Sequence, residues 1–436
     1  MNRGARRAYG ALVIRPRRFV PFRPILVACA ALTLGMSAPQ RSGASPASPT
    51  PPIQLVESVP VEAGLGNPDL PRARDVWPAL IAGARRSIDF EEFYFSNGPA
   101  LEPVVTAIGD AARRGVRVRI LLDRRMHDTY SQPADSLGHL PGIEVREVDF
   151  GPLAGGVQHA KYFLVDGSTV FVGSQNLDWR ALEHIHELGL AVRDARLAKI
   201  FGDVFASDWA LAANPADSAA RRALSGDHPV GELPIVIVQA PGDTARLWPS
   251  YSPRGWIPDS TRWDRDAVVR LIDSARHDLV GQSLTYSSED RRNPDPAIHD
   301  ALTRAAARGV IVRLVISDWE SDEGLAQLRS LSAVPGISVR LSRVPDWSGG
   351  YVPFARVEHC KYLVADSARL WVGTGNLEPS YFFRTRNLAL TIENGRLAGA
   401  AVKSFEASWR AAATQAVQPD SRFTPRAHGE GPPHTK

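Results

Sequence analysis

One sequence pattern occurs twice in this chain, 200 positions apart. The first copy, VQHAKYFLVDGSTVFVGSQN, covers residues 157–176, and the second, VEHCKYLVADSARLWVGTGN, covers residues 357–376. Both copies read H-x-K-x4-D-x6-G-[ST]-x-N. Chance supplies one such string far more readily than two in the same register. The repeat therefore predicts a duplicated fold, in which each of two similar halves carries one copy.

The segments around the two copies also follow the same order. Hydrophobic spacing in the first half predicts a helix over 76–86, a strand over 87–95, a helix over 99–114 and a strand over 116–123. The second half repeats this order at 267–278, 279–286, 296–308 and 310–318, and each half closes with an aromatic helix, at 201–209 and 402–409. Strands that alternate with helices predict the α/β class, with a mixed sheet flanked by helices in each half.

The chain divides at stretches that are poor in core-forming residues. Ser and Pro dominate residues 41–60, which we expect to be an extended tether, and residues 416–436 have the composition of a flexible tail. Between them we expect a first domain at 61–215, a linker at 216–230 and a second domain at 231–415. Neither copy of the motif holds a complete set of catalytic groups. We therefore expect the two domains to pack about a pseudo-two-fold axis, with one shared active site.

The N-terminal segment, residues 1–40, has the pattern of an export signal. Eight arginines and no acidic residue lie within residues 1–41, which include an apolar stretch at 25–36. This stretch is shorter than the roughly 20 residues of a membrane-spanning helix but suits the core of a signal peptide. We expect an exported protein, periplasmic or extracellular. A twin-arginine signal at Arg17-Arg18, lipid attachment at Cys29 and a retained membrane anchor are the alternatives.

The charge of the chain does not point to a nucleic-acid partner. The formal net charge is +4, but the arginines of residues 1–41 account for eight of the 51 basic side chains. The rest of the chain has 43 basic and 47 acidic residues, so its body is mildly acidic.

The chain has two cysteines, Cys29 and Cys360. Removal of an export signal would leave one thiol, so no intrachain disulfide is expected. Cys360 is a candidate nucleophile, but on a strand it points away from its neighbours His359 and Lys361. We interpret it as a small buried residue.

The repeated motif supplies groups that suit phosphate chemistry. Residues at i and i+2 of a strand share a face, so His159 and Lys161 point the same way, as do His359 and Lys361. Two such faces combine two imidazoles, two ammonium groups and two asparagine amides. Lysine and amide donors stabilise the charge of a phosphoryl transition state, while one imidazole attacks phosphorus and the other protonates the leaving oxygen. No carboxylate cluster suggests a two-metal site, so neither a metal nor another cofactor is expected.

Both copies of the motif resemble the paired signature of the phospholipase D superfamily, and the repeat runs from about residue 75 to 410. Two further stretches, LDWRALEHIHELGL after the first copy and GTGNLEPSYF in the second half, resemble the endolysosomal phospholipase D-like exonucleases and their poxvirus envelope relatives. The resemblance implies a phosphodiesterase that needs no metal. Animal members of this subgroup trim single-stranded DNA and RNA from the 5′ end, and lipid transphosphatidylation has also been assigned to them.

The resemblance also implies roles for individual residues. His159 would form a phosphohistidine, and His359 would serve as acid and then as base for water. Family members often carry a carboxylate 28 residues after the histidine, which orients its imidazole. Glu187 stands at this place in the first half and Asn387 in the second, which favours a Glu187-backed His159 as the nucleophile. The phosphate would be held by six side chains, those of Lys161, Lys361, Asn176, Asn376, Ser174 and Thr374.

The aspartates of the motif, Asp166 and Asp366, are also candidate catalytic residues. Because they lie past the end of the strand, a structural role explains them better. They would fix the turn or pair with a basic neighbour.

The stretch EHIHE at 183–187 suggests a metal site. On a strand, however, His184 and His186 share one face, and Glu183 and Glu187 lie on the other. One site cannot easily collect all four side chains.

Other residues near the motifs have both a structural and a functional interpretation. Glu91 and Glu92 either face the cleft or are charges at its rim. Aromatic residues after the motifs either pack in the core or contact substrate, and two arginines either bind further phosphates or are solvated; they are Trp179, Tyr381, Phe382, Phe383, Arg384 and Arg386.

Three functions are open from the sequence. The first is a phosphodiesterase that acts on single-stranded nucleic acid, and the second is a phospholipase D or phosphatidyltransferase that acts on membrane lipids. The third is a non-catalytic envelope or binding protein, against which the two intact motifs argue. The sequence does not indicate an oligomeric state.

Overall fold

The computed structural model describes residues 50–423, 426 and 429. These residues belong to one compact unit, Thr50–Lys436. The expected export signal at 1–40 and the start of the expected tether lie outside the described residues. Among the described residues, no helix is both long and apolar enough to cross a membrane.

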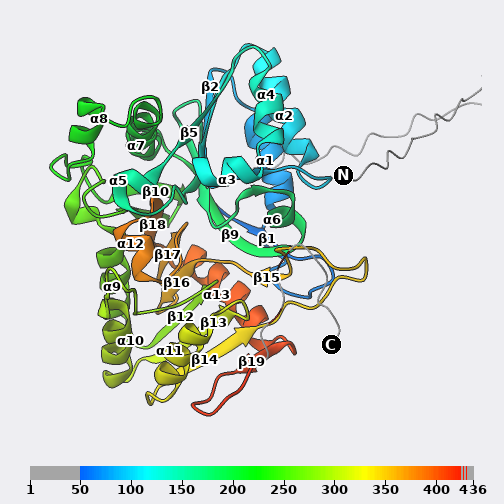
Figure 1. Ribbon diagram of the computed structural model, residues 1–436. Helices are drawn as coiled ribbons and strands as arrows, with labels where there is room; N and C mark the ends of the chain where they lie inside the picture. Colours follow the sequence, from blue (N-terminus) through cyan, green and yellow to red (C-terminus); the bar gives the residue numbers. More distant parts are fainter. Residues whose placement is uncertain (1–49, 424–425, 427–428, 430–436) are drawn as a thin grey trace, which may run out of the picture. The chain divides into compact units, whose positions relative to one another are not determined.

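The first half is built on a mixed sheet (Figure 1) in the order β1-β9-β7-β6-β2-β4-β5. Its strands are β1 (Ile53–Ser58), β2 (Ser87–Glu92), β4 (Arg117–Asp123), β5 (Ile143–Val148), β6 (Lys161–Val165), β7 (Thr169–Gly173) and β9 (Ile185–Arg193), with the short pair β3 (Phe95–Ser96) and β8 (Leu177–Asp178) beside it. Its helices are α1 (Ala73–Ala82), α2 (Glu102–Arg113), α3 (Arg124–Thr129), α4 (Gln132–Gly138), α5 (Phe150–Ala154), α6 (Trp179–Glu183) and α7 (Ala195–Ala213). Strands β2, β4 and β5 are parallel, whereas β6, β7, β9 and β1 form antiparallel pairs.

The second half repeats this plan in the order β10-β11-β18-β17-β16-β12-β13-β14-β19. Its strands are β10 (Ile235–Ala240), β11 (Asp243–Ser252), β12 (Asp278–Ser283), β13 (Ile311–Ser317), β14 (Ile337–Ser342), β16 (Tyr362–Ala365), β17 (Arg369–Gly373), β18 (Asn387–Glu393) and β19 (Thr414–Ala416). Its helices are α9 (Asp264–Ser274), α10 (Ala297–Ala307), α11 (Asp322–Ser332), α12 (Pro379–Phe383) and α13 (Gly395–Arg410), with a short 3-10 turn at Ser260–Arg262. The predicted α/β class, with a mixed sheet in each half, is confirmed.

Equivalent residues end equivalent elements in the two halves. Helices α2 and α10 each stop one residue before a glycine with positive φ, Gly115 at +86° and Gly309 at +88°. Glycine adopts this left-handed conformation without a Cβ penalty, and it turns the chain directly into β4 and β13. The repeated GV dipeptide of the sequence therefore marks the same helix-to-strand turn twice.

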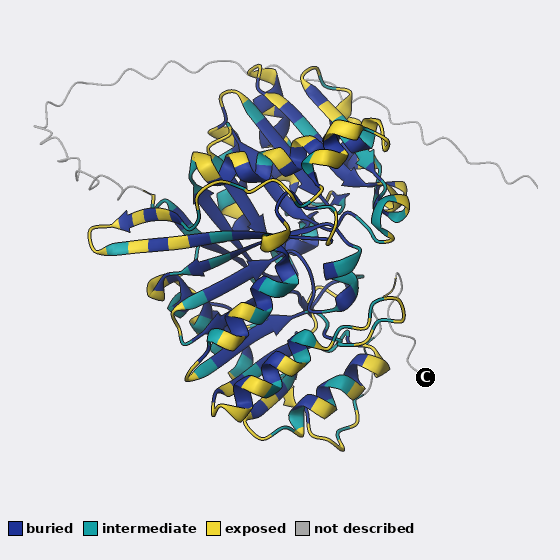
Figure 2. Ribbon diagram, turned by 90° about the vertical axis from the view of Figure 1, so that its left-hand side faces the viewer, coloured by how far each residue is buried: buried dark blue, intermediate teal, exposed yellow. Residues whose placement is uncertain are grey.

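Strand alternation separates the core from the site. Along β6, Tyr162 and Leu164 pack toward α7, where the rings of Tyr162 and Phe201 lie 5.7 Å apart. The opposite face carries Phe163, which packs against Trp77 of α1. Figure 2 shows the strands mostly buried and the outer faces of the helices exposed. The apolar residues on both faces thus fix the strand that presents His159 and Lys161.

The two halves exchange short strand pairings. A further strand, β15 (Val357–Glu358), comes from the second half and pairs in parallel with β9 of the first, so that His359 N–H donates to the carbonyl of His186 at 2.9 Å. In the equivalent place, His159 N–H donates to the carbonyl of Arg386 at 3.0 Å. Each motif histidine is therefore held against the last sheet strand of the other half, as two-fold-related packing predicts.

Three boundaries differ from the sequence prediction. Residues 53–58 of the expected tether form β1, because their apolar side chains pair with the apolar strand β9. The expected linker at 216–230 contains helix α8 (Ser218–Ala223), which is capped by the Asp217 side chain. The expected tail remains packed up to Val417, which is buried next to β14.

Candidate active site

The two motif histidines contact residues of the opposite halves. The Nδ1 atom of His159 lies 3.1 Å from Oδ1 of Asn387, and the Nδ1 atom of His359 lies 2.8 Å from Oε2 of Glu187. Both imidazoles are buried, with 6% and 9% of their residue surface exposed. The cross-half strand pairings put Asn387 next to His159 and Glu187 next to His359. The prediction of one site shared by both halves therefore has a structural basis.

The prediction that Glu187 orients His159 is wrong. Counting along the chain places Glu187 one strand after His159, but β9 carries this side chain to the boundary between the halves. There the parallel pairing of β15 with β9 brings His359 beside it. Each half orients the histidine of the other half rather than its own.

The partners of Asn387 determine the tautomer of His159. Its amide nitrogen donates to the carbonyls of Tyr381 and Thr385, both at 3.2 Å. Its amide oxygen accepts from the hydroxyl of Thr374 at 2.9 Å, so Oδ1 must also be the atom that faces the ring. An oxygen can only accept, and Nδ1 of His159 therefore carries the hydrogen. The neutral ring keeps its lone pair on Nε2.

Burial and the two lysines lower the pKa of both histidines. Burial is the largest cause for each ring, and the ammonium groups of Lys161 and Lys361 lower both pKa values further. Burial raises the pKa of Glu187 well above its usual range. Glu187 and His359 therefore retain one proton between them, whereas the amide of Asn387 cannot hold one for His159.

The lysines lie close together and are short of negative charge. Each donates to the carbonyl of its own motif histidine, Lys161 at 2.6 Å and Lys361 at 2.9 Å. Burial lowers the pKa of Lys361 to about 8 and that of Lys161 well below its usual value, and the charge of Lys361 lowers the latter further. An anion that binds between the two lysines would restore their charge.

The two motif asparagines present unpartnered atoms. Oδ1 of Asn176 and Oδ1 of Asn376 are both buried without a hydrogen-bond partner. A buried polar atom without a partner costs free energy, and a 180° rotation of the amide would place N–H donors in the same position. Both side chains are thus available to a ligand.

A family model described as cardiolipin synthase, PLD-like domain, matches residues 78–209 and 268–409, one match in each half. This chain belongs to the phospholipase D-like family. It is 31% identical over 375 residues to the 5'-3' exonuclease PLD3 of Bos taurus, with 78% of this chain and 75% of that protein covered. It is also 31% identical over 396 residues to Phospholipase D Z of Dictyostelium discoideum, with 82% of this chain and 89% of that protein covered.

The solved structures agree on the fold. Phosphatidylserine synthase from Haemophilus influenzae Rd KW20 superposes with a TM-score of 0.58 at 14% identity, over 79% of this chain and 85% of that one. At this identity the likeness concerns the fold. Together with the named relatives, it makes this chain a phosphodiesterase of the phospholipase D superfamily.

Not every residue of the family motif lies in the site. The carboxylate of Asp166 accepts from the backbone N–H groups of Arg85, Arg86 and Ser87, at the end of β6 that is remote from His159. Asp366 accepts in the same way from the N–H groups of residues 276–278. Both aspartates have positive φ, 54° in each case. They hold a turn, as the structural interpretation predicted, and their inclusion among the catalytic residues is corrected.

The hydroxyls of Ser174 and Thr374 are also already engaged. Ser174 Oγ donates to the carbonyl of Leu188 at 3.3 Å, and Thr374 Oγ1 donates to Asn387. Both residues are fully buried. They position the residues behind the histidines, so their predicted contact with the phosphate is corrected.

An aromatic track surrounds His159 in this phospholipase D-like site. The ring centroids of Phe93 and Tyr381 lie 4.7 and 5.0 Å from the His159 ring. Next to Phe93, Tyr94 stacks on Tyr130 with a centroid distance of 5.2 Å. All four rings are half-buried. Of these only Tyr381 was a sequence candidate, although the run FEEFYF at 90–95 was an available signal for Phe93 and Tyr94.

The other uncertain residues resolve as buried or paired. Glu91 and Glu92 are buried, so neither is a rim charge, and Lys161 is the charge that lowers the pKa of Glu92 against burial. Arg386 is fully buried and pairs with Asp208 at 2.7 Å. The remaining candidates divide between core and partner contacts: Phe382 is buried, Trp179 and Phe383 are half-buried, and Arg384 pairs with Asp290.

Proposed function

We propose that this chain hydrolyses phosphodiesters through a covalent phosphohistidine, that it does so without a catalytic metal, and that its substrate is single-stranded nucleic acid. The crossed pairing of the histidines carries this proposal. One ring has an amide partner and a free Nε2 lone pair, and the other shares a proton with a carboxylate. These are the states that a nucleophile and a general acid need.

The reaction would proceed in two displacements. Nε2 of His159 attacks phosphorus, and His359 gives its proton to the leaving oxygen as the phosphorus–oxygen bond breaks. His359 then removes a proton from water, which attacks the phosphohistidine and releases His159. Lys161, Lys361 and the amides of Asn176 and Asn376 are suited to stabilising the non-bridging oxygens in both steps.

The aromatic track favours nucleic acid as the substrate. Phe93, Tyr94, Tyr130 and Tyr381 lie next to the reacting histidine and are half-exposed. Successive bases of a single strand stack on such rings without sequence preference. Similarity to PLD3, whose name describes a 5'-3' exonuclease, supports the same choice.

A phospholipid substrate is the second candidate. Phospholipase D Z is a relative of equal identity. Half-buried Trp179 and Trp347 also pack on a small apolar cluster at the boundary between the halves, which includes Ile185 and Val352. Such a surface suits acyl chains as well as bases.

The test offers the full chain both substrates in parallel. We expect shortening of 5′-hydroxyl single-stranded oligonucleotides and little release of headgroups from phosphatidylcholine or phosphatidylglycerol vesicles. Tyr94→Ala and Tyr130→Ala should raise KM for oligonucleotides about tenfold or more and leave the hydrolysis of bis-p-nitrophenyl phosphate unchanged. Headgroup release that is faster than oligonucleotide cleavage would make the lipid assignment the correct one.

A second measurement tests the absence of a catalytic metal. Because two lysines supply the positive charge, initial rates should be unchanged in excess EDTA, and vanadate should inhibit. An immediate loss of activity on chelation, restored by Mg²⁺, would contradict the proposed reaction. Export of the chain stays part of the proposal, and mass spectrometry of the mature N-terminus tests it.

A further inference from the structure

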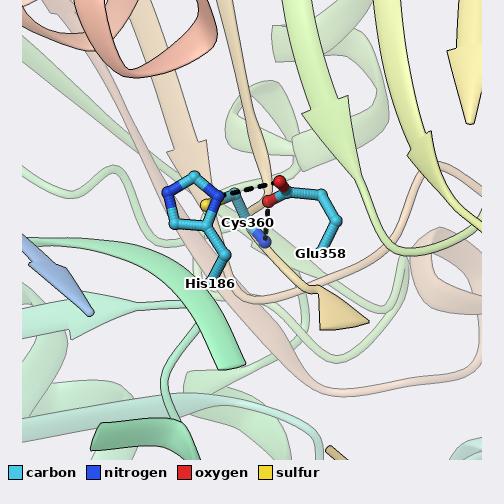
Figure 3. A group of neighbouring side chains, drawn as sticks. All are labelled: His186, Glu358 and Cys360. Carbon is cyan, nitrogen blue, oxygen red and sulfur yellow. Dashed lines mark hydrogen bonds and ion pairs between the residues drawn. The ribbon is translucent and has the colours of Figure 1, made fainter. Parts of the chain in front are cut away.

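A second group of reactive side chains lies behind the site, on the opposite face of the motif strand. Figure 3 shows His186 from β9 together with Glu358 from β15 and Cys360, which follows it. All three residues are buried. Because Glu358 and Cys360 alternate with His359 and Lys361, they point away from the catalytic histidine. No role in phosphodiester hydrolysis uses this group.

The donor atoms of this group converge. One ligand atom from each of the three side chains lies within 4.8 Å of the other two. Nδ1 of His186 is 2.8 Å from Oε2 of Glu358. The hydroxyl of Ser408 lies 3.3 Å from this carboxylate and 3.5 Å from Nδ1, which adds a fourth donor on the same side. Imidazole, thiolate and carboxylate are together the ligand types that zinc prefers.

The other nitrogen of His186 has the partner that a metal ligand needs. Nε2 lies 3.1 Å from Oε1 of Glu57, whose carboxylate also pairs with Arg72 at 2.6 Å. A histidine that binds a metal through one nitrogen usually donates its other N–H to a carboxylate, which fixes the ring. Glu57 holds His186 with Nδ1 directed at Glu358, where the metal would lie.

We propose that His186, Glu358 and Cys360 bind a structural Zn²⁺ ion, with the Ser408 hydroxyl as the nearest additional oxygen donor. Two of the ligands belong to the second half and the imidazole belongs to the first. The ion joins the halves where β15 meets β9. This proposal does not depend on the substrate or on the reaction at the catalytic histidines.

Charge balance allows the ion in this buried place. Without metal, an imidazolium at His186 and the Arg72 guanidinium offset the carboxylates of Glu57 and Glu358, and the thiol is neutral. Zinc binding releases one proton from Nδ1 of His186 and one from the thiol of Cys360. Two protons leave as two positive charges enter, so the group stays neutral in both states.

The equivalent place in the other half lacks these ligands. Arg386, Gln158 and Ala160 stand 200 positions from His186, Glu358 and Cys360, respectively. Arg386 is a permanent cation that pairs with Asp208, and alanine has no donor. One half therefore has a fixed charge where the other has a set of metal ligands.

Metal analysis of the full chain tests the proposal. The protein is purified without chelators or a histidine tag, and zinc is measured by inductively coupled plasma mass spectrometry. We expect about one zinc ion per chain. Expression in zinc-depleted medium with cobalt should give a thiolate-to-cobalt charge-transfer band in the near ultraviolet, which reports Cys360 directly.

Three variants and one control make the outcome decisive. Cys360→Ala, Cys360→Ser and Glu358→Gln should each lose zinc, and both cysteine variants should lose the cobalt band. The control is His127→Gln, in the other described group with suitable ligands, His127, Asp128 and Glu147; it should keep both signals. Less than about a tenth of an ion per chain, or zinc retained in both cysteine variants, would overturn the proposal. His186 would then be an imidazolium between two carboxylates.

Discussion

The two halves of this chain share a fold and a motif, but they place different groups behind the catalytic histidines. The first half supplies a carboxylate, Glu187, to His359. The second half supplies an amide, Asn387, to His159. A carboxylate can hold a proton beside the ring and an amide cannot. Duplication has thus produced one site in which two identical side chains differ in their protonation.

The difference extends one residue further along each strand. Behind the first motif, Arg386 pairs with Asp208, while behind the second His186 lies between Glu57 and Glu358. In both places a positive charge is surrounded by carboxylates at the boundary between the halves. Only the histidine can exchange its proton for a metal ion. The halves therefore agree in charge and differ in chemistry.

The largest expected effect separates the roles of the two histidines. His159→Ala removes the nucleophile, so turnover of any phosphodiester should fall by at least about a thousandfold, good leaving groups included. His359→Ala removes the acid, but p-nitrophenolate leaves with little protonation. This variant should therefore release one equivalent of p-nitrophenolate and accumulate phosphohistidine at position 159, because water lacks its base.

Mass spectrometry of the acid-labile phosphate checks this assignment. His127→Gln serves as a histidine control away from the catalytic pair and should have normal turnover. Phosphate on His359 in the His159→Ala protein, with none on His159 in the converse variant, would reverse the two roles.

A smaller effect is expected from the carboxylate itself. Glu187→Gln keeps the hydrogen bond to His359 but cannot retain a proton. Rates with alkoxide leaving groups should fall about 10- to 100-fold, a part of what a general acid contributes. Rates with p-nitrophenyl esters should change much less. Equal losses with both kinds of substrate would mean that Glu187 serves the nucleophilic step instead.

Much of this comparison follows from the sequence, and its central feature does not. The repeat predicts both sheets, the helix order and the strand faces, because side-chain alternation is local. Glu187 lies 28 residues after His159, so position in the chain suggests the pair that the structure corrects. The true pairs depend on β15 meeting β9, a contact between halves that local patterns do not encode.

The same limit applies to the residues that sequence reasoning missed. Glu57 falls in a segment whose Ser and Pro content suggested a tether, yet β1 carries it into the cluster around His186. Phe93 and Tyr94 stand next to a predicted strand, but their positions beside His159 depend on how the chain bends after β2. Cys360 was predicted to be buried and to point away from His359, and both predictions hold because they need only the strand period.

Exchanging the amide for a carboxylate should change the pH profile more than the maximal rate. In the native site, burial and the two lysines hold the pKa of His159 well below its usual range, so the nucleophile is neutral at pH 7. Asn387→Asp places a negative charge beside the ring and raises this pKa. The ascending limb of kcat/KM with p-nitrophenyl esters should move to higher pH by about one unit, with near-native rates on the alkaline side.

The comparison variant for this experiment is Glu187→Gln. It changes the group behind the acid, so it should leave the ascending limb in place. A profile that shifts equally in both variants would show that the two histidines are not distinguished by their partners.

The smallest effect is expected where the halves are most alike. Burial alone would raise the pKa of Asp166, but the backbone N–H groups of Ser87, Arg86 and Arg85 outweigh it and lower the pKa. Asp366 has the same arrangement and the same direction of shift. Asp166→Asn and Asp366→Asn should each lower the free energy of unfolding by about 1–2 kcal/mol, because each weakens charge-assisted bonds to the backbone. A lowered carboxyl pKa stabilises the fold above the unfolded-state value near 4, so the loss should be present at pH 7 and disappear as the pH falls toward 3. Urea unfolding at several pH values measures this, and kcat should stay within about twofold of the native enzyme because the turn is remote from the site. A large fall in kcat at unchanged stability, in either variant, would return that aspartate to the catalytic residues and separate two positions that the structure makes equivalent.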